Sequence, residues 1–278
     1  MQKEEILKSC AKCLGDTRKK TPLCPSITNT VTINFVANAQ LAAGGSAAMV
    51  YLPDEGEFLG KNCDAFYINF GTLFPIYEET LPKTMESLHK NNKMWVIDPV
   101  GLGIGSLRTK LETCAKQFKP SIIRGNASEI ISLAKLWNLL SEEDTKKSSG
   151  AKGVDSTDEV MDAKTAAMAL ANYTGGAVAV SGKTDLVTNG KLSVLCHGGS
   201  AFLPLITGAG CSLGGVCAVF ASTSNAFIGA LTATLVYNSA SSKAEKYSAG
   251  PGNFQPNFLD EIYKTTEEDL LNSNIEII

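Results

Sequence analysis

The sequence lacks both a long hydrophobic run and a long block of like charge. Its longest apolar stretch, 218–237, is interrupted by Ser222-Thr223-Ser224-Asn225, which predicts two core helices in place of a membrane span. There are 25 Lys and Arg against 28 Asp and Glu, so the formal net charge is only -3. A nucleic-acid surface needs a basic stripe that displaces counterions from phosphates. The composition therefore favours neither a membrane protein nor a nucleic-acid-binding protein.

Eight cysteines are present, but the patterns that would pair them or bind a metal are missing. The N-terminus, Met1-Gln2-Lys3-Glu4-Glu5, carries charges of both signs and no apolar core, so no secretory leader is predicted. The one pair with zinc-knuckle spacing, Cys10-Ala11-Lys12-Cys13, has no second pair of ligands. Cys196 and Cys217 lie in apolar runs, where a thiol packs as a small hydrophobe. We expect reduced thiols and a cytoplasmic protein.

Strand-like and helical segments alternate along most of the 278 residues, 44% of which are hydrophobic. The predicted strands are 47–51, 65–69, 94–98, 121–124 and 177–181. The predicted helices are 75–91, 106–118, 127–139 and 159–173. Such alternation is typical of parallel strands joined by right-handed crossovers, hence of a doubly wound α/β fold. Residues 185–188, the Asn189-Gly190 turn and 191–197 predict an antiparallel hairpin at the sheet edge.

The remaining segments predict one domain over 1–278. Residues 1 to about 15 predict an amphipathic helix that ends at Gly15-Asp16, within an N-terminal helical extension of residues 1–20. Two prolines make 19–26 irregular, and 28–41 predicts a helix closed by Gly44-Gly45. The polar stretch 141–158 predicts a surface loop. No shift in composition marks a second domain.

Polar residues follow several of the predicted strands. Because ligands of open α/β sheets bind beyond the carboxyl ends of the strands, Asp98, Arg124, Ser181 and the turn at Gly208 are candidates for one site. Asp98 either caps the turn at Pro99 or binds a metal ion. The fork of Arg124 suits phosphate oxygens or, alternatively, an ordinary salt bridge. These residues predict a ligand-binding α/β enzyme without naming its ligand.

Two roles are possible for Glu129, a helix cap and a metal ligand. It follows Asn126 by three residues, the spacing of a helix capping box. It is also a carboxylate of the kind that holds magnesium through retained waters. The sequence leaves both roles open.

The turn Gly208-Ala209-Gly210-Cys211 precedes the apolar run 216–220. Two glycines allow a tight turn, and the run predicts a buried helix that begins near Cys211. Free N–H groups and the macrodipole at a helix N-terminus attract anions, including charge that develops during phosphoryl transfer. The same pattern also arises where backbone merely packs closely against a neighbouring element.

A resemblance to a known family decides between these readings. From about Thr21 to the C-terminus the chain resembles hydroxyethylthiazole kinases of the ribokinase-like superfamily. The blocks that carry the resemblance are Ile27-Thr28-Asn29, Asn34-Phe35-Val36-Ala37-Asn38, Ile97-Asp98-Pro99-Val100-Gly101, Ile123-Arg124-Gly125-Asn126-Ala127-Ser128-Glu129, Gly153-Val154-Asp155-Ser156, Val180-Ser181-Gly182, Gly208-Ala209-Gly210-Cys211 and Gly250-Pro251-Gly252-Asn253-Phe254. The resemblance implies a three-layer α/β/α sandwich with a mostly parallel sheet and an antiparallel edge.

The resemblance also implies roles for single residues. It implies Asp98 and Glu129 as ligands of Mg²⁺ through water. It implies Arg124, Ser181 and Asn29 as contacts to the co-substrate ATP, with contact to the alcohol as the other role for Asn29. It implies Met49 and Gly208 as contacts to the thiazole. The catalytic residues implied are Gly208, Ala209 and Gly210, which form the anion hole, and Cys211.

Cys211 stands where ribokinase-like kinases commonly carry the aspartate base. A helix N-terminus can lower the pKa of a thiol, which predicts a modest general base; the alternative is that Cys211 only shapes the pocket.

The activity implied is ATP- and Mg²⁺-dependent phosphorylation of the hydroxyl of 4-methyl-5-(2-hydroxyethyl)thiazole, which supplies thiamine phosphate synthesis. The alternatives are a related kinase for hydroxymethylpyrimidine and an inactive sensor that binds thiazole or nucleotide. The resemblance further implies a homotrimer in which Asn29 and Met49 meet Gly208 of a neighbouring chain. One departure bears on the acceptor: the family often has histidine before Ile-Thr-Asn, where this chain has Cys24-Pro25-Ser26.

Overall fold

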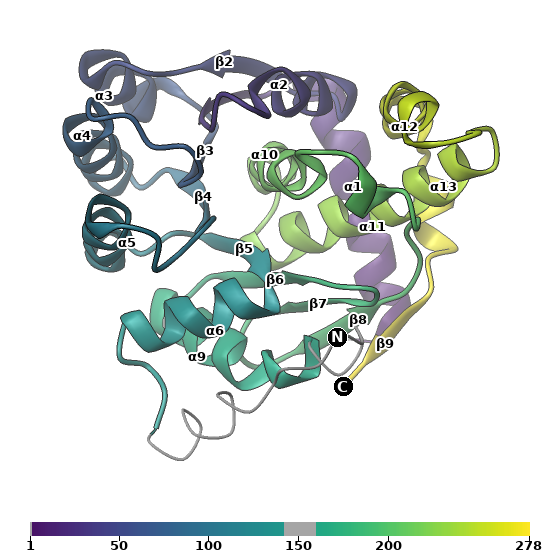
Figure 1. Ribbon diagram of the computed structural model, residues 1–278. Helices are drawn as coiled ribbons and strands as arrows, with labels where there is room; N and C mark the ends of the chain where they lie inside the picture. The colour runs from purple at the N-terminus through teal and green to yellow at the C-terminus, as the bar shows by residue number, and fades with distance from the viewer. Residues whose placement is uncertain (1, 142–159) are drawn as a thin grey trace.

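A single nine-stranded sheet runs through the computed structural model, which describes residues 2–141 and 160–278 (Figure 1). The strand order is β2-β1-β3-β4-β5-β6-β7-β8-β9. The strands are β1 Leu23–Ile27, β2 Ser46–Met49, β3 Ala65–Asn69, β4 Met94–Asp98, β5 Ile122–Asn126, β6 Ala177–Ser181, β7 Asp185–Thr188, β8 Ser193–Cys196 and β9 Ile275–Ile277. Pairing is parallel from β2 to β6 and antiparallel from β6 to β9. The predicted parallel sheet with an antiparallel edge is confirmed, and β9 lies outside the predicted hairpin.

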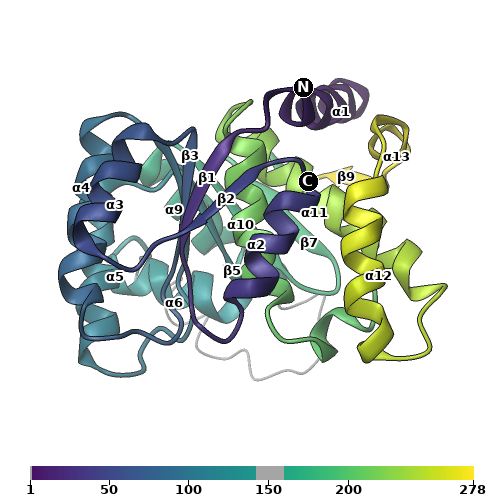
Figure 2. The same cartoon turned by 90° about the horizontal axis from the view of Figure 1, so that it is seen from above.

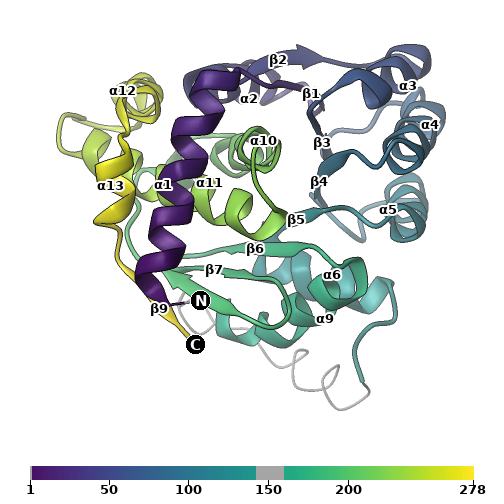
Figure 3. The same cartoon turned by 180° about the vertical axis from the view of Figure 1, so that it is seen from behind.

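Helices cover both faces of the sheet. On one face lie α1 Lys3–Lys20, α2 Ile33–Ala42, α10 Ala209–Ala221, α11 Ala226–Glu245, α12 Pro251–Lys264 and α13 Glu267–Leu271. The other face carries α3 Pro53–Asn62, α4 Tyr77–Lys90, α5 Ser106–Phe118, α6 Ala127–Leu136 and α9 Lys164–Thr174. Seen from above, α12 lies beside α2, and from behind α1 runs along α11 toward α13 (Figures 2 and 3). The predicted three-layer sandwich is therefore confirmed.

The two hydrophobic cores follow the alternation of side chains along each strand. On β3, Tyr67 belongs to the core beneath α10, and Phe66 and Ile68 belong to the core beneath the opposite helices. The side chain of Tyr67 fits between the sheet and α10 because residue 214 of this helix is glycine. A Cβ at Gly214 would lie 2.4 Å from Cε2 of Tyr67. Helix α10 thus lies directly on the sheet, with its N-terminus above the carboxyl ends of the strands.

The first helix is longer than predicted. The end predicted at Gly15-Asp16 is wrong, since α1 continues to Lys20 and stops at Thr21, whose φ is 47°. Gly15 instead permits close packing, because a Cβ there would meet the side chain of Glu267 on α13. A glycine inside a helix was interpreted as a stop, although here it lies within α1 beside the exposed side chain of Glu267.

Two further boundaries differ from the predictions. The segment 19–26 was predicted to be irregular, but its residues 23–26 belong to β1. This strand pairs with β3 only from Ser26 onward, so the missing N–H of Pro25 interrupts no bond of that ladder. The helix predicted from Thr28 begins at Ile33, because Asn29 accepts the N–H of Thr32 in a turn.

The other predicted elements can be compared directly. The strands 94–98 and 177–181 and the helix 106–118 have the predicted bounds. The long apolar stretch is divided between α10 and α11 as predicted, and among the described residues no helix is long and apolar enough to cross a membrane. The predicted surface loop 141–158 and the block 153–156 lie almost wholly outside the described residues.

Candidate active site

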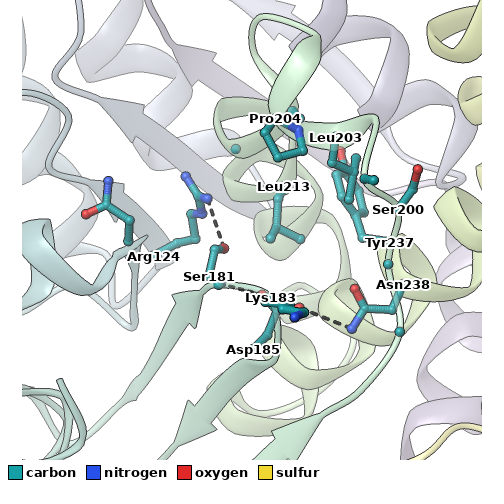
Figure 4. Close-up of a pocket in the computed structure, with 17 residues that line it drawn as sticks. Arg124, Ser181, Lys183, Asp185, Ser200, Leu203, Pro204, Leu213, Tyr237 and Asn238 are labelled. Carbon is teal, nitrogen blue, oxygen red and sulfur yellow. Dashed lines mark hydrogen bonds between the residues drawn. The ribbon is translucent and has the colours of Figure 1, made fainter. Parts of the chain in front are cut away.

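A cavity of about 750 Å³ opens beyond the carboxyl ends of β5 and β6 (Figure 4). Four of the predicted site residues line it: Arg124, Ser181, Ala209 and Gly210. Its opposite wall comes from residues 198–201, from Leu203 and Pro204 of the short 3-10 helix Leu203–Leu205, and from α11. The cavity therefore lies beyond the carboxyl ends of the parallel strands, at the sheet edge where ligand binding was predicted.

Arg124 is held at the centre of this edge. Its Nη2 donates to Oγ of Ser181 at 2.9 Å, and its Nη1 donates to Oδ2 of Asp98 at 3.3 Å. Only 8% of Arg124 is exposed, so the salt bridge is buried and is not the surface pair considered as an alternative. A Cβ at Gly210 would lie 2.5 Å from Nη1, so this glycine allows the first turn of α10 to approach the guanidinium. The group thus faces the cavity with its orientation fixed.

Asp98 is fully buried at the end of β4. Its Oδ2 accepts three hydrogen bonds: from Tyr67 Oη at 3.0 Å, Asn69 Nδ2 at 3.2 Å and Arg124 Nη1. Its Oδ1 accepts none from the described residues. Burial raises the pKa of Asp98, although Arg124 and the other donors lower it in part. One carboxylate oxygen is therefore buried without a partner, which is costly unless another group meets it.

Glu129 forms the capping box that its spacing predicts. Asn126 Oδ1 accepts the N–H of Glu129 at 2.9 Å, and Glu129 Oε2 accepts the N–H of Asn126 at 2.8 Å. Burial raises the pKa of Glu129, and the negative charge of Asp98 raises it further. The structure therefore brings the two predicted metal ligands close enough to repel each other.

Asn69 and Tyr67 belong to this site and were missed by the sequence analysis. Asn69 Nδ2 donates to Tyr67 Oη at 2.9 Å as well as to Asp98, and its Oδ1 accepts from Asn29 Nδ2 at 3.0 Å. Asn69 ends a predicted strand, so the strand-end rule could have found it. Nothing in the sequence pattern distinguishes Tyr67 from its apolar neighbours on β3.

Asn29 lies at the other end of this network, beyond Asn69, and does not line the cavity. Besides Asn69, its Nδ2 donates to Sγ of Cys211 at 3.4 Å, within the same chain. A neighbouring chain is thus not needed to bring Asn29 to the turn at Gly208, contrary to the expectation. Met49 ends β2, the edge strand, opposite Ser26 of β1.

Cys211 lies in the first turn of α10, after Gly208 with its φ of 89°. Burial raises the pKa of the Cys211 thiol and the charge of Asp98 raises it further, while Arg124, Thr32 and Asn29 lower it by less. The pKa is therefore not lowered as expected, because desolvation and the nearby carboxylate raise it. Both effects favour the protonated thiol over the thiolate.

The chain is similar in sequence and in fold to known proteins. The hydroxyethylthiazole kinase family model matches residues 14–268. Hydroxyethylthiazole kinase of Bifidobacterium animalis subsp. lactis is 46% identical over 262 residues, which is 92% of this chain and 86% of that protein. The structure of a hydroxyethylthiazole kinase protein from Pyrococcus horikoshii superposes with a TM-score of 0.84 at 26% identity, covering 97% and 98% of the two chains. A ribokinase-like superfamily protein from Enterococcus faecalis shares the fold, with a TM-score of 0.63 at 11% identity and coverage of 90% and 89%.

Proposed function

The chain belongs to the hydroxyethylthiazole kinase family, and on that premise we propose how its site transfers a phosphoryl group from ATP to the thiazole alcohol. The observation that carries the proposal is the position of Arg124, which joins Asp98 to Ser181 and faces the cavity. A planar guanidinium in this orientation suits the oxygens of a polyphosphate. The cavity then binds ATP, with Arg124 and Ser181 as contacts to its phosphates.

The N-terminus of α10 supports the position of the transferred group. The first intrahelical bond of this turn runs from Ser212 N to Gly208 O, so the N–H groups of residues 209–211 are free to meet an anion. Gly210 brings them next to Arg124. Charge that develops on the phosphoryl group is thereby stabilised from two sides, which is the main contribution a protein makes to this reaction.

Asp98 and Glu129 fit a magnesium ion. Asp98 Oδ1 has no donor among the described residues, and the charge of Asp98 raises the pKa of Glu129, so a cation beside both relieves an unpaired acceptor and a repulsion. No cluster of three or more His, Cys, Asp or Glu side chains that could hold a metal occurs in the described residues. Two carboxylates with retained waters and substrate phosphates are the usual way in which Mg²⁺ is held. When bound there, Mg²⁺ neutralises phosphate charge.

The acceptor alcohol is assigned to the side of α10 that faces Asn29. The Gly208 turn, Cys211 and Asn29 meet here, with Met49 as a further contact to the thiazole. Asn69 connects this side to Asp98, because it donates to Asp98 and accepts from Asn29. The metal carboxylate and the acceptor pocket are therefore positioned by one hydrogen-bonded chain.

The test of this function is magnesium-dependent release of ADP from ATP with hydroxyethylthiazole, measured beside hydroxymethylpyrimidine and a control without acceptor. Turnover with the thiazole alone is expected. Preference for the pyrimidine would mean that the acceptor was assigned from the wrong relatives. Binding of the thiazole without turnover would favour the sensor.

Replacing Cys211 with alanine is expected to leave a folded enzyme whose turnover falls by only about tenfold or less. The reason is that burial and the charge of Asp98 raise the pKa of Cys211 and so oppose formation of the thiolate, while the anion hole and Arg124 are untouched. Cys211→Asp restores the base common in ribokinase-like kinases and is expected to keep or raise activity. Initial rates from pH 6 to pH 9 measure both; a fall near a thousandfold in Cys211→Ala would instead make the thiol an essential base.

We propose a homotrimer in which Met49 of a neighbouring chain completes the acceptor site, whereas Asn29 reaches the Gly208 turn within its own chain. Exposed apolar side chains lie on elements around this side, namely Val31, Leu41, Leu52 and Phe58, each about half exposed or more. A contact between chains would cover some of these side chains. Sedimentation velocity at micromolar protein concentration tests the proposal, and a monomer that phosphorylates the thiazole at full rate would rule it out. The cytoplasmic location remains a prediction of the sequence.

A further inference from the structure

Two polar residues that the proposed reaction does not use lie at the end of the cavity away from Arg124. Asn238 of α11 lines the cavity although only 7% of it is exposed, and Asp185, the first residue of β7, lies beneath it. Figure 4 shows Arg124 on one side of the cavity and Asn238 on the other, with the Asn238 amide directed at Asp185. These two groups are therefore placed where a ligand anchored at Arg124 would end.

The contacts of Asp185 fix which way the Asn238 amide faces. Asp185 Oδ1 accepts the N–H of Gly182 at 3.0 Å, and its Oδ2 accepts from Asn238 Nδ2 at 3.1 Å. Burial raises the pKa of Asp185 to about 6, so the group is a carboxylate at neutral pH and can only accept. The NH₂ of Asn238 must therefore face Asp185, and its carbonyl oxygen must face away from it.

That carbonyl oxygen is a free acceptor at the cavity wall. Oδ1 of Asn238 lies 3.5 Å from the position that a Cβ would take on Gly199, which also lines the cavity. No residue in the described parts of the chain, 2–141 and 160–278, donates a hydrogen bond to this oxygen. An oriented acceptor without a protein partner at the wall of a binding cavity is a specificity element.

We propose that Asn238 reads the base of the nucleotide by accepting a hydrogen bond from the exocyclic amino group of adenine. The inference rests on the proposed nucleotide site. The phosphates bind at Arg124 and Ser181, and the apolar side chains of Leu203, Pro204 and Leu213 line the space that leads from there to Asn238. A nucleotide held by its phosphates thus extends its base along apolar walls toward the Asn238 amide.

The chemistry of the purines makes this contact selective. Adenine carries an amino donor at position 6, whereas hypoxanthine and guanine carry a carbonyl acceptor there. Two acceptors that face each other leave both unpaired, and a site built to receive a donor rejects an analogue that lacks it. The cavity should therefore bind ATP more tightly than ITP or GTP.

Calorimetric titration of the full chain with ATP, ITP and GTP in the presence of Mg²⁺ tests the inference. The wild-type protein is expected to bind ATP about tenfold more tightly than ITP. Asn238→Ser removes the carbonyl and keeps a small donor near Asp185, so the ratio of the two dissociation constants should fall to near one. Ser239→Ala, the adjacent residue on α11 that does not line the cavity, is the matched control and should keep the wild-type ratio.

The ratio within one variant separates base reading from a general defect, because a folding defect weakens ATP and ITP alike. If Asn238→Ser does not fold, Asp185→Asn serves instead: it lets the Asn238 amide turn over and should also reduce the ratio. Equal binding of ATP and ITP by the wild-type protein, or an unchanged ratio in Asn238→Ser, would overturn the inference.

The experiments distinguish failure of adenine recognition by Asn238 from failure of the proposed kinase reaction. Turnover of the thiazole with ATP and ITP bound equally would refute the role of Asn238 and leave the kinase standing. Selective binding of ATP without turnover of any alcohol would refute the kinase and support the role of Asn238. Failure of every nucleotide to bind would overturn both.

Discussion

Asp98→Asn is expected to lower turnover by roughly a hundredfold to a thousandfold at every magnesium concentration. The donors Tyr67, Asn69 and Arg124 all approach Oδ2, so the carbonyl oxygen of the new asparagine must take that position. Its NH₂ then replaces Oδ1, which has no donor among the described residues. An amide donor directed at the proposed metal position repels a cation, although the side chain keeps its shape.

Turnover at saturating ATP and thiazole, measured across magnesium concentrations, tests this expectation. Asp64→Asn is the matched control, because Asp64 precedes β3 and so lies at the amino end of the strands, where it accepts the N–H of Leu23 and pairs with Lys20. Thermal unfolding of both variants separates chemistry from folding, since Arg124 also loses its charged partner in Asp98→Asn. Wild-type turnover and magnesium dependence in a folded Asp98→Asn protein would refute the metal role.

Glu112 is expected to make the protein less stable as the pH rises through neutrality. This residue of α5 is fully buried, and neither carboxylate oxygen has a donor in the described residues. Burial raises its pKa from 4.5 to about 8, and the charges of Glu129 and Asp98 add to the rise while Arg108 opposes it. The folded protein therefore holds a proton at Glu112 that the unfolded chain releases.

The direction of this pH effect on stability follows from which state, folded or unfolded, binds the proton more tightly. Between pH 4.5 and pH 8 unfolding releases a proton, so the free energy of unfolding falls with rising pH by about 1.4 kcal/mol per unit. Between pH 5 and pH 7.5, deprotonation linked to Glu112 alone lowers the free energy of unfolding by about 3 kcal/mol. Glu112→Gln cannot ionise, so that part of the fall should disappear.

Urea unfolding at pH 5, 6, 7 and 8 measures the effect as the difference between wild type and Glu112→Gln. Asp98, Glu129 and Asp185 also have raised pKa values, but they titrate in both proteins, so the difference reports Glu112 together with its coupling to Glu129 and Asp98. Glu129→Gln would not be a clean control because it changes the capping box of α6. Parallel stability curves would mean that Glu112 has a partner or is hydrated.

Much of the fold could be predicted from local pattern. The strands 94–98 and 177–181 are short apolar runs, and the helix 106–118 has a clear helical period, so each element was found with its observed bounds. The break between α10 and α11 is a cluster of small polar residues that ends any apolar run. These features depend on the residues of one segment and on nothing that the segment packs against.

Part of the site followed from the same reasoning. Arg124 and Ser181 each end a predicted strand, and the glycine turn precedes an apolar helix, so their residues were expected at one sheet edge; Arg124, Ser181, Ala209 and Gly210 line one cavity there. The family resemblance named the chemistry, and the comparisons confirm the family. The individual roles of these residues stay predictions to be tested by the variants above.

The rest was decided by contacts between segments far apart in the sequence. Gly15 and Pro25 look like chain breaks, yet one lies inside α1 against Glu267 and the other inside β1. Asn238 became a candidate only because α11 places it above Asp185. No local pattern carries this information, because it depends on which segments become neighbours.

Electrostatics depended on the tertiary structure most of all. Cys211 was expected to have a lowered pKa because its own helix begins there, but burial and the charge of Asp98 raise it. Glu112 reads as an ordinary helix residue, and only the packing of α5 buries its carboxylate without a partner. The sequence determined the order of the elements and the sheet edge that carries the polar groups. Folding decided their protonation, because a pKa depends on desolvation and on charges brought near through space.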